Sequence, residues 1–298
     1  MLKRSQSFTP NKQVVRDLQC NAIHKHLAAR LGHLSYFGLP SSSLQDVAQW
    51  SPLLERITAV ERGESGSEWI LQNELLVNAF KLGVSSKLTL LRGDIDQVLI
   101  TGKDCFGSTP RWPYDIVTLD YSGGLFYRVG PQQPQRLEAI KQVFVRQAAA
   151  GAADFVFFLS FNLDQIDQHE VRESLNVMRR DLKRFGRSAD NVMDAYFNHP
   201  KEQARLKLYV MNLTAQLAAQ AQFDSDSEPP IFYVGNKRTE MMAFRCFLKR
   251  SSRTFVPRAP KERLHQIVNR RMIEIAEGKQ IFTNLGLPLI KAEATHEN

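Results

Sequence analysis

The stretch Asp154-Phe-Val-Phe-Phe-Leu-Ser160 gives the strongest strand signal in the 298-residue sequence. Its apolar residues follow one another without polar alternation, which is typical of a strand buried on both faces of a sheet. Shorter stretches of strand character precede it, at 34–40, 57–61, 87–91 and 115–120. Helical patterns surround them, at 11–31, 41–54, 67–82 and 135–150. This alternation predicts βαβ crossovers and a parallel sheet covered by helices on both faces.

The pattern changes after residue 160. Helices are predicted over 170–185 and 200–222, and the acidic, proline-bearing segment 223–230 is predicted to be a surface linker. Strands at 231–234 and 241–248, joined by a turn at 236–238, predict a hairpin that adds an antiparallel strand to the sheet. A basic helix is predicted over 261–277. The expected fold class is therefore α/β, with a mostly parallel sheet and a C-terminal antiparallel hairpin strand.

Positive charge is concentrated near the C-terminus. The chain has 39 Lys and Arg against 31 Asp and Glu, a formal net charge of +8, and residues 236–271 hold eleven basic residues against two acidic ones. Clustered positive charge favours a polyanion, because binding releases the counterions condensed on phosphates. A solvated basic face, an acidic protein and a membrane surface are the alternatives that the charge leaves open. The candidate nucleic-acid contacts are Lys237, Arg238, Lys249, Arg250, Arg253, Arg258, Lys261, Arg263, Arg270 and Arg271.

Several classes of protein are disfavoured by what the sequence lacks. The three cysteines are far apart and form no CxxC pair, which disfavours a zinc ribbon and a disulfide framework and favours a reduced, cytoplasmic setting. No apolar run approaches the ~18 residues of a membrane span, and no secretory signal is evident at the N-terminus. The motifs of P-loop hydrolases and of serine hydrolases are absent. No metal site is expected, because the histidines at 24, 26 and 33 have no accompanying acid or cysteine ligands.

The order of these elements resembles the class I S-adenosylmethionine-dependent methyltransferase superfamily, a Rossmann-like fold, over residues 11 to 250. In that superfamily the first strand ends in a glycine-rich turn against the cofactor. Phe37, Gly38 and Pro40 stand at this place, with one glycine where the superfamily usually has two or three. The second strand ends at Glu61 and Arg62, and the resemblance implies that the carboxylate of Glu61 accepts hydrogen bonds from the ribose hydroxyls.

Two further strand ends carry the rest of the resemblance. Asp94 and Ile95 follow the third strand, where the resemblance implies that the carboxylate meets the adenine amino group and the apolar side chain lies along the ring. Asp120 and Tyr121 end the fourth strand, which is the catalytic edge of the superfamily. Asp120 would hydrogen-bond an acceptor amino group, and Tyr121 would stack on the target base. Ser-Gly-Gly follows them where base-methylating members carry two prolines and an aromatic residue.

The resemblance implies S-adenosylmethionine as cofactor and methyl transfer as reaction, and together with the basic segment it predicts the amino group of a nucleic-acid base, in RNA or DNA, as acceptor. The alternative is a catalytically inactive methyltransferase-like subunit that binds nucleic acid or protein, which the single glycine favours. A protein partner or a homo-oligomer stays open. Residues 1–250 are expected to form the Rossmann domain, with 165–225 as a helical insertion or lid. Residues 251–298 are expected to form a basic helical extension.

Overall fold

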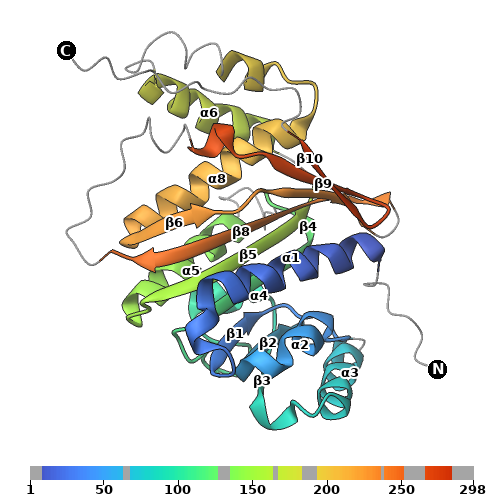
Figure 1. The fold of residues 1–298 in the computed structure, drawn as a ribbon. Helices are drawn as coiled ribbons and strands as arrows, with labels where there is room; N and C mark the ends of the chain where they lie inside the picture. The colour runs from blue at the N-terminus through green and yellow to red at the C-terminus, as the bar shows by residue number, and fades with distance from the viewer. Residues whose placement is uncertain are drawn as a thin grey trace.

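The protein is seen in a computed structural model that describes residues 9–62, 68–126, 135–163, 167–182, 193–235, 238–251 and 266–283. Within these residues one sheet of ten strands forms the centre of the molecule (Figure 1). Its strands are β1 Leu34–Gly38, β2 Leu54–Glu61, β3 Leu88–Arg92, β4 Ile116–Gly124, β5 Asp154–Asn162, β6 Phe223–Ser227, β7 Ile231–Val234, β8 Glu240–Arg250, β9 Met272–Ala276 and β10 Lys279–Thr283.

The first five strands are parallel and stand in the order β3-β2-β1-β4-β5. β8 then pairs with β5 in antiparallel fashion, and β6 and β7 pair with successive parts of the other side of β8. β9 continues the sheet parallel to β7, and β10 closes it as an antiparallel neighbour of β9. The predicted parallel sheet and the antiparallel hairpin strand are therefore confirmed.

Helices cover both faces of the sheet. One face carries α1 Pro10–Leu27, α2 Gln45–Trp50 and α3 Glu68–Lys81, whose buried residues share a core with β1, β2 and β5. The other face carries α4 Ile95–Thr101, α5 Gln135–Ala149, α6 Gln168–Leu182 and α8 Glu202–Gln220. A short helix of residues 193–197 packs beside α6 and α8. α1 also contacts β5 and the strands from β7 to β10, so it crosses most of that half of the sheet (Figure 1).

β5 shows why its residues had to be apolar throughout. Phe155, Phe157 and Leu159 point into the core under α5, whereas Val156 and Phe158 point into the core under α1 and α2. Successive side chains of a strand alternate between the faces of a sheet, and here both faces are covered. All five side chains are at most 1% exposed.

Two predictions about the C-terminal half are wrong. The segment predicted as a linker contains β6, whose ladder with β8 ends just before Pro229 and Pro230, two residues without an N–H to donate. The helix predicted over 261–277 is helical only over 266–269 in the part that the structure describes, and β9 follows it. Ile273 and Ile275 decide this, because their two-residue spacing places both under α1. β9 and β10 lie in the region predicted as a C-terminal extension, 251–298, and they belong to the same sheet as the other strands.

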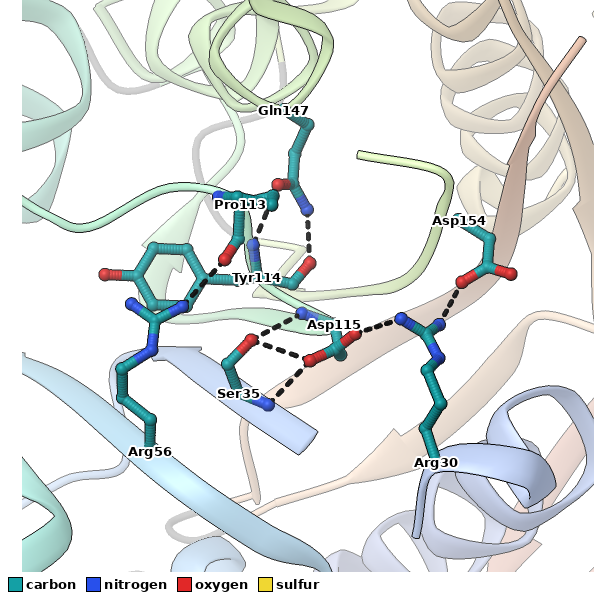
Figure 2. A network of polar contacts seen from close by, with 8 residues as sticks. All are labelled: Arg30, Ser35, Arg56, Pro113, Tyr114, Asp115, Gln147 and Asp154. Carbon is teal, nitrogen blue, oxygen red and sulfur yellow. Dashed lines mark hydrogen bonds and ion pairs between the residues drawn. The ribbon is translucent and has the colours of Figure 1, made fainter. Parts of the chain in front are cut away.

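An ion-pair cluster fixes the starts of the central strands, at the edge of the sheet where β1, β4 and β5 begin (Figure 2). The guanidinium group of Arg30 donates to the carboxylates of both Asp115 and Asp154. Asp115 also accepts from the backbone N–H and the hydroxyl of Ser35, at 2.7 Å each. Three neighbouring parallel strands are thus held in register by one arginine and its two acids.

Candidate functional site

A crevice of about 370 Å³ opens at the opposite edge, where the parallel strands end. This volume falls within the ~300–1,000 Å³ range of small-molecule sites. Ligands of open α/β sheets bind at this edge, where the strand order reverses, and here the reversal lies between β1 and β4. The residues lining the crevice are Lys12, Leu39, Ser41, Ser42, Glu61, Arg62, Leu71, Asp94, Ile95, Asp96, Asp120, Tyr121, Ser122, Arg136 and Met241.

The crevice brings together six residues that the sequence placed at separate strand ends: Glu61, Arg62, Asp94, Ile95, Asp120 and Tyr121. This agreement follows from the topology, because parallel strands that end at one edge of a sheet present their final residues side by side. Glu61 is the last residue of β2, and its carbonyl accepts from the N–H of Gly93 after β3, which joins the two strand ends. The six residues therefore line one crevice and do not form three unrelated turns.

Asp94 has a structural role at the crevice wall. Its Oδ1 accepts from the backbone N–H groups of Asp96 and Gln97 at 2.8 and 3.4 Å, so it caps the N-terminus of α4. Its Oδ2 lies 3.1 Å from a guanidinium nitrogen of Arg62. Ile95, the first residue of α4, is 5% exposed. The predicted contact between Asp94 and adenine stays a prediction, and both of its oxygens already have partners in this structure.

A buried cluster of Asp96, Tyr121 and Arg136 lies on the side of the crevice formed by α4, α5 and β4. The Tyr121 hydroxyl donates to Oδ1 of Asp96 at 2.7 Å, and Nε of Arg136 donates to Oδ2 at 3.4 Å. Burial raises the pKa of Asp96, although the hydrogen bond from Tyr121 and the charge of Arg136 oppose this. Burial also raises the pKa of the Tyr121 phenol well above its ordinary value.

Tyr121 is therefore held in place and covered. Tyr121 is only 3% exposed, and the guanidinium carbon of Arg136 lies 3.9 Å from the centroid of its ring. Stacking of a target base on this ring, as the sequence predicted, requires Arg136 to move from that face. In the structure the ring serves as a support for Arg136 through a cation–π contact.

Asp120 is paired with a residue from outside the parallel sheet. Nζ of Lys12, in the first turn of α1, lies 2.6 Å from Oδ2 of Asp120. The negative charge of Asp120 raises the pKa of Lys12, against the opposing effect of burial. The side chains of Lys12 and Asp120 are 26% and 16% exposed, so the pair is partly shielded from water.

The turn after β1 contributes to the crevice through other residues than those predicted. Leu39, Ser41 and Ser42 line it, whereas Phe37 is fully buried against the rings of Trp112 and Tyr114. The side chain of Phe37 points to the α4–α5 face because of strand alternation, and Pro40 is buried as well.

Gly38 is required by packing between strands. A Cβ at this position would lie 2.3 Å from the carbonyl oxygen of Thr118 and 2.8 Å from the hydroxyl of Tyr36. The close approach of β1 and β4 explains why a glycine stands at position 38, and no bound ligand is needed for the explanation.

The basic candidates that fall within the described residues do not gather on one side of the molecule. Arg238 is exposed and lies between β7 and β8, at the same edge as the crevice residue Met241. Lys249 lies opposite Asp154 in the backbone ladder of β5 and β8, at the other end of these strands. It is roughly 26 Å from Met241 at the rise of a β-strand. Arg250 follows Lys249. Arg270 lies 3.2 Å from Asp226, and Arg271 is exposed beside it. Lys237, Arg253, Arg258, Lys261 and Arg263 lie outside the described residues.

Lys12, Asp96 and Arg136 are crevice residues that sequence reasoning missed. Asp96 could have been noticed, because it follows the candidate residue Asp94 by two positions. Lys12 and Arg136 carry no local signal, since they reach the crevice from α1 and from the first turn of α5. Among the described residues no group of three or more His, Cys, Asp or Glu side chains could hold a metal ion, and no helix there is long and apolar enough to cross a membrane.

The strand order β3-β2-β1-β4-β5, with an antiparallel strand beside β5, is that of the Rossmann-like class I methyltransferase fold. No protein-family profile and no curated relative matches the sequence. Solved structures similar in fold include the O-methyltransferase TomG from Streptomyces achromogenes in complex with SAM, at 14% identity, covering 81% of this chain and 88% of that one, with a TM-score of 0.42.

Two others have comparable scores. An rRNA methylase from Streptococcus thermophilus is 13% identical, with coverage of 78% and 96% and a TM-score of 0.41. A precorrin-6y C5,15-methyltransferase from Geobacter metallireducens is 11% identical, with coverage of 80% and 89% and a TM-score of 0.40. The strand order itself defines the fold. Similarities of this size do not identify a reaction.

Proposed function

We propose that the crevice binds S-adenosylmethionine and that the protein is a methyltransferase. The observation that supports this most directly is the position of Glu61, at the end of β2 and beside the strand reversal, in a crevice of fitting volume. A carboxylate offers only acceptors, which suits the two donors of a ribose diol. Ile95, which also lines the crevice, offers apolar surface to a base. When bound, the cofactor supplies a methyl group on a sulfonium.

The protein's own part in this reaction is to position the methyl acceptor and to exclude water. Methyl transfer from a sulfonium needs little acid–base assistance, so the rate depends on the alignment of the acceptor. Asp120 is the group that would orient an acceptor amino group, by accepting a hydrogen bond from its N–H. Because Lys12 occupies Oδ2 of Asp120, the acceptor must displace Lys12 or use the other oxygen.

The acceptor that we propose is the amino group of a nucleic-acid base. The excess of basic residues in 236–271 supports a polyanion, and Arg238 lies in the β7–β8 turn, at the same end of the strands as the crevice residue Met241. A salt titration of oligonucleotide affinity tests this, since each phosphate contact contributes to the slope of log K against log salt. A flat slope, or no methyl incorporated into RNA or DNA from labelled cofactor, would remove the nucleic-acid proposal while leaving cofactor binding intact.

A catalytically inactive binding subunit is the second candidate. The Lys12–Asp120 ion pair and the covered ring of Tyr121 favour it, because both predicted catalytic groups already have partners. The two candidates differ in a measurable way. The enzyme transfers a labelled methyl group to some acceptor, whereas the subunit retains fold and partner binding without transfer.

Isothermal titration with S-adenosylmethionine and with its demethylated product tests the site. We expect wild-type protein to bind, and Glu61→Gln to bind about tenfold or more weakly, because charged acceptors form the stronger hydrogen bonds. Glu55→Gln is the matched control, since Glu55 lies on the same strand at the other edge and its side chain is 65% exposed. Absence of heat with both ligands, or equal affinity of the two variants, contradicts the proposal.

A further inference from the structure

Arg92, the last residue of β3, contacts two exposed aromatic rings. Its guanidinium carbon lies 4.8 Å from the centroid of the Trp69 ring and 5.4 Å from the centroid of the Phe106 ring. Large aromatic residues are ordinarily covered, but Trp69 and Phe106 are 41% and 63% exposed. The cation–π contacts therefore join the two rings while leaving much of both open to water. We call Trp69, Arg92 and Phe106 the aromatic platform.

The turn that carries Phe106 is fixed by Asp104. One oxygen of Asp104 accepts from the backbone N–H groups of Phe106 and Ser108, at 2.9 and 2.8 Å. Its other oxygen accepts from the N–H of Arg92 at 3.1 Å, and the N–H of Cys105 donates to the Arg92 carbonyl at 3.0 Å. Phe106 is thus held beside β3, so a ligand meets a surface that is already formed and does not have to order a loop.

The aromatic platform lies beside the crevice, at the end of the sheet that β3 forms (Figure 1). Arg92 is the ladder partner of Glu61, and Trp69 stands two residues before Leu71. Glu61 and Leu71 both line the crevice. Asp120 ends three strands away in the order β3-β2-β1-β4, which is about 14 Å at the spacing of neighbouring strands. A group on the platform is therefore a neighbour of the group that reaches Asp120, and not the same group.

The charges near the aromatic platform favour an anionic ligand. Between β3 and β4 the exposed charged side chains are those of Lys103 and Arg111, which are both basic. Asp96 and Asp104 are buried, and Asp94 caps the N-terminus of α4. A nucleotide matches this combination, because its base offers a flat face to an aromatic ring and its phosphate offers negative charge to the surrounding cations.

We propose that the aromatic platform stacks a base of a single-stranded nucleic acid, next to the base that enters the crevice. Bases of every kind have a π-face, so the contact requires an unpaired strand and does not read its sequence. A base within a duplex is already covered by its neighbours and would have to be extruded first. This inference rests on the nucleic-acid part of the proposed function, and it does not depend on S-adenosylmethionine binding.

Quenching of tryptophan fluorescence tests the stacking directly. The full chain is titrated with a short single strand of mixed sequence, made once as RNA and once as DNA. Trp50 is fully buried and Trp112 packs against Phe37, so Trp69 is the indole that is open to a base. We expect quenching on binding. Trp69→Phe should abolish the quenching and keep the affinity within about twofold, because it preserves an aromatic ring for stacking.

Affinity measured by fluorescence anisotropy tests the second ring. Phe106→Ala should raise the dissociation constant for the single strand about tenfold, within the range for loss of one stacked base. Phe80→Ala is the matched control and should leave the constant unchanged. Phe80 is 79% exposed, and it lies roughly 16 Å further along the axis of α3 than Trp69.

The cation of the platform has a signature of its own. Arg92→Gln should weaken binding and reduce the slope of log K against log salt by about one, as the loss of one phosphate contact does. The same sequence supplied as a duplex should bind wild-type protein more weakly than the single strand. Circular dichroism confirms that each variant is folded.

The outcomes separate this inference from the proposed function. Binding of the single strand without quenching overturns the platform, and so does a folded Phe106→Ala variant that binds as tightly as Phe80→Ala. Both results leave the nucleic-acid acceptor standing. A wild-type protein that binds neither RNA nor DNA overturns the platform and the nucleic-acid acceptor together, whereas titration with S-adenosylmethionine decides cofactor binding separately.

Discussion

Nζ of Lys12 lies 2.6 Å from Oδ2 of Asp120, and this ion pair joins the first turn of α1 to β4 at the crevice. The pair has two consequences. It supplies the counter-charge for a carboxylate that is only 16% exposed, and it places an ammonium group where an acceptor would have to approach. A ligand that binds Oδ2 of Asp120 competes with Lys12 for it.

Asp120→Asn should lower the pKa of Lys12. The charge of Asp120 is the largest influence on this pKa and raises it, whereas burial lowers it, so removing the charge leaves burial as the main effect. The lysine Cε and Hε resonances followed by NMR against pH measure the change, and Lys12→Met assigns the signal. An unchanged titration in Asp120→Asn would show that the pair does not form in solution.

Gly38→Ala should destabilise the protein by about 1–3 kcal/mol, as overpacking in a close-packed core does. The added Cβ would meet the Thr118 carbonyl oxygen at 2.3 Å, a backbone atom that cannot turn aside. Urea denaturation measures the free energy of unfolding. Gly123→Ala is the control, because its Cβ would meet only the end of the Arg136 side chain at 3.4 Å, and equal stability of the two variants would refute the packing role of Gly38.

Lys207 should make stability depend on pH above neutrality. Its Nζ donates to the Tyr196 hydroxyl and the Val268 carbonyl at 3.1 Å each, and burial lowers its pKa to about 7 from 10.5. Between these values the unfolded chain binds a proton that the folded protein does not, so the free energy of unfolding rises with pH across this window. The slope is at most about 1.4 kcal/mol per pH unit.

Lys207→Met provides the comparison, because it keeps the length of the side chain and removes the titration. We expect the difference in unfolding free energy between wild type and variant to move in favour of the wild type from pH 7 to pH 10. Chemical denaturation at several pH values measures it. A difference that stays constant over that range contradicts a lowered pKa for Lys207.

The sequence predicted the central sheet well and its far edge poorly, for a physical reason. β5 is apolar on both faces, and this pattern has one interpretation wherever the strand lies in the chain. Residues 272–276 are apolar at positions that fit helical and strand spacing alike, and the contact of Ile273 and Ile275 with α1 decides between the two. That contact joins residues more than 250 positions apart, which no local pattern contains.

The residues of the crevice also divide into those that the sequence could predict and those that it could not. Glu61, Asp94 and Asp120 were predictable because each follows a recognisable strand in a parallel sheet. Lys12 and Arg136 were not, because they enter the crevice from helices whose placement depends on tertiary packing.

Asn11 precedes Lys12 in the first turn of α1 and holds that turn to the C-terminal strands. Its Oδ1 accepts from the N–H of Gly278 in the β9–β10 hairpin at 2.8 Å, and its Nδ2 donates to the Val234 carbonyl at the end of β7 at 3.0 Å. A shift of this turn that released Asp120 would strain both of those bonds. Ligand binding at Asp120 and the position of the β9–β10 hairpin are therefore coupled through Asn11 and Lys12. A spectroscopic label on the hairpin would report on ligand binding in the crevice.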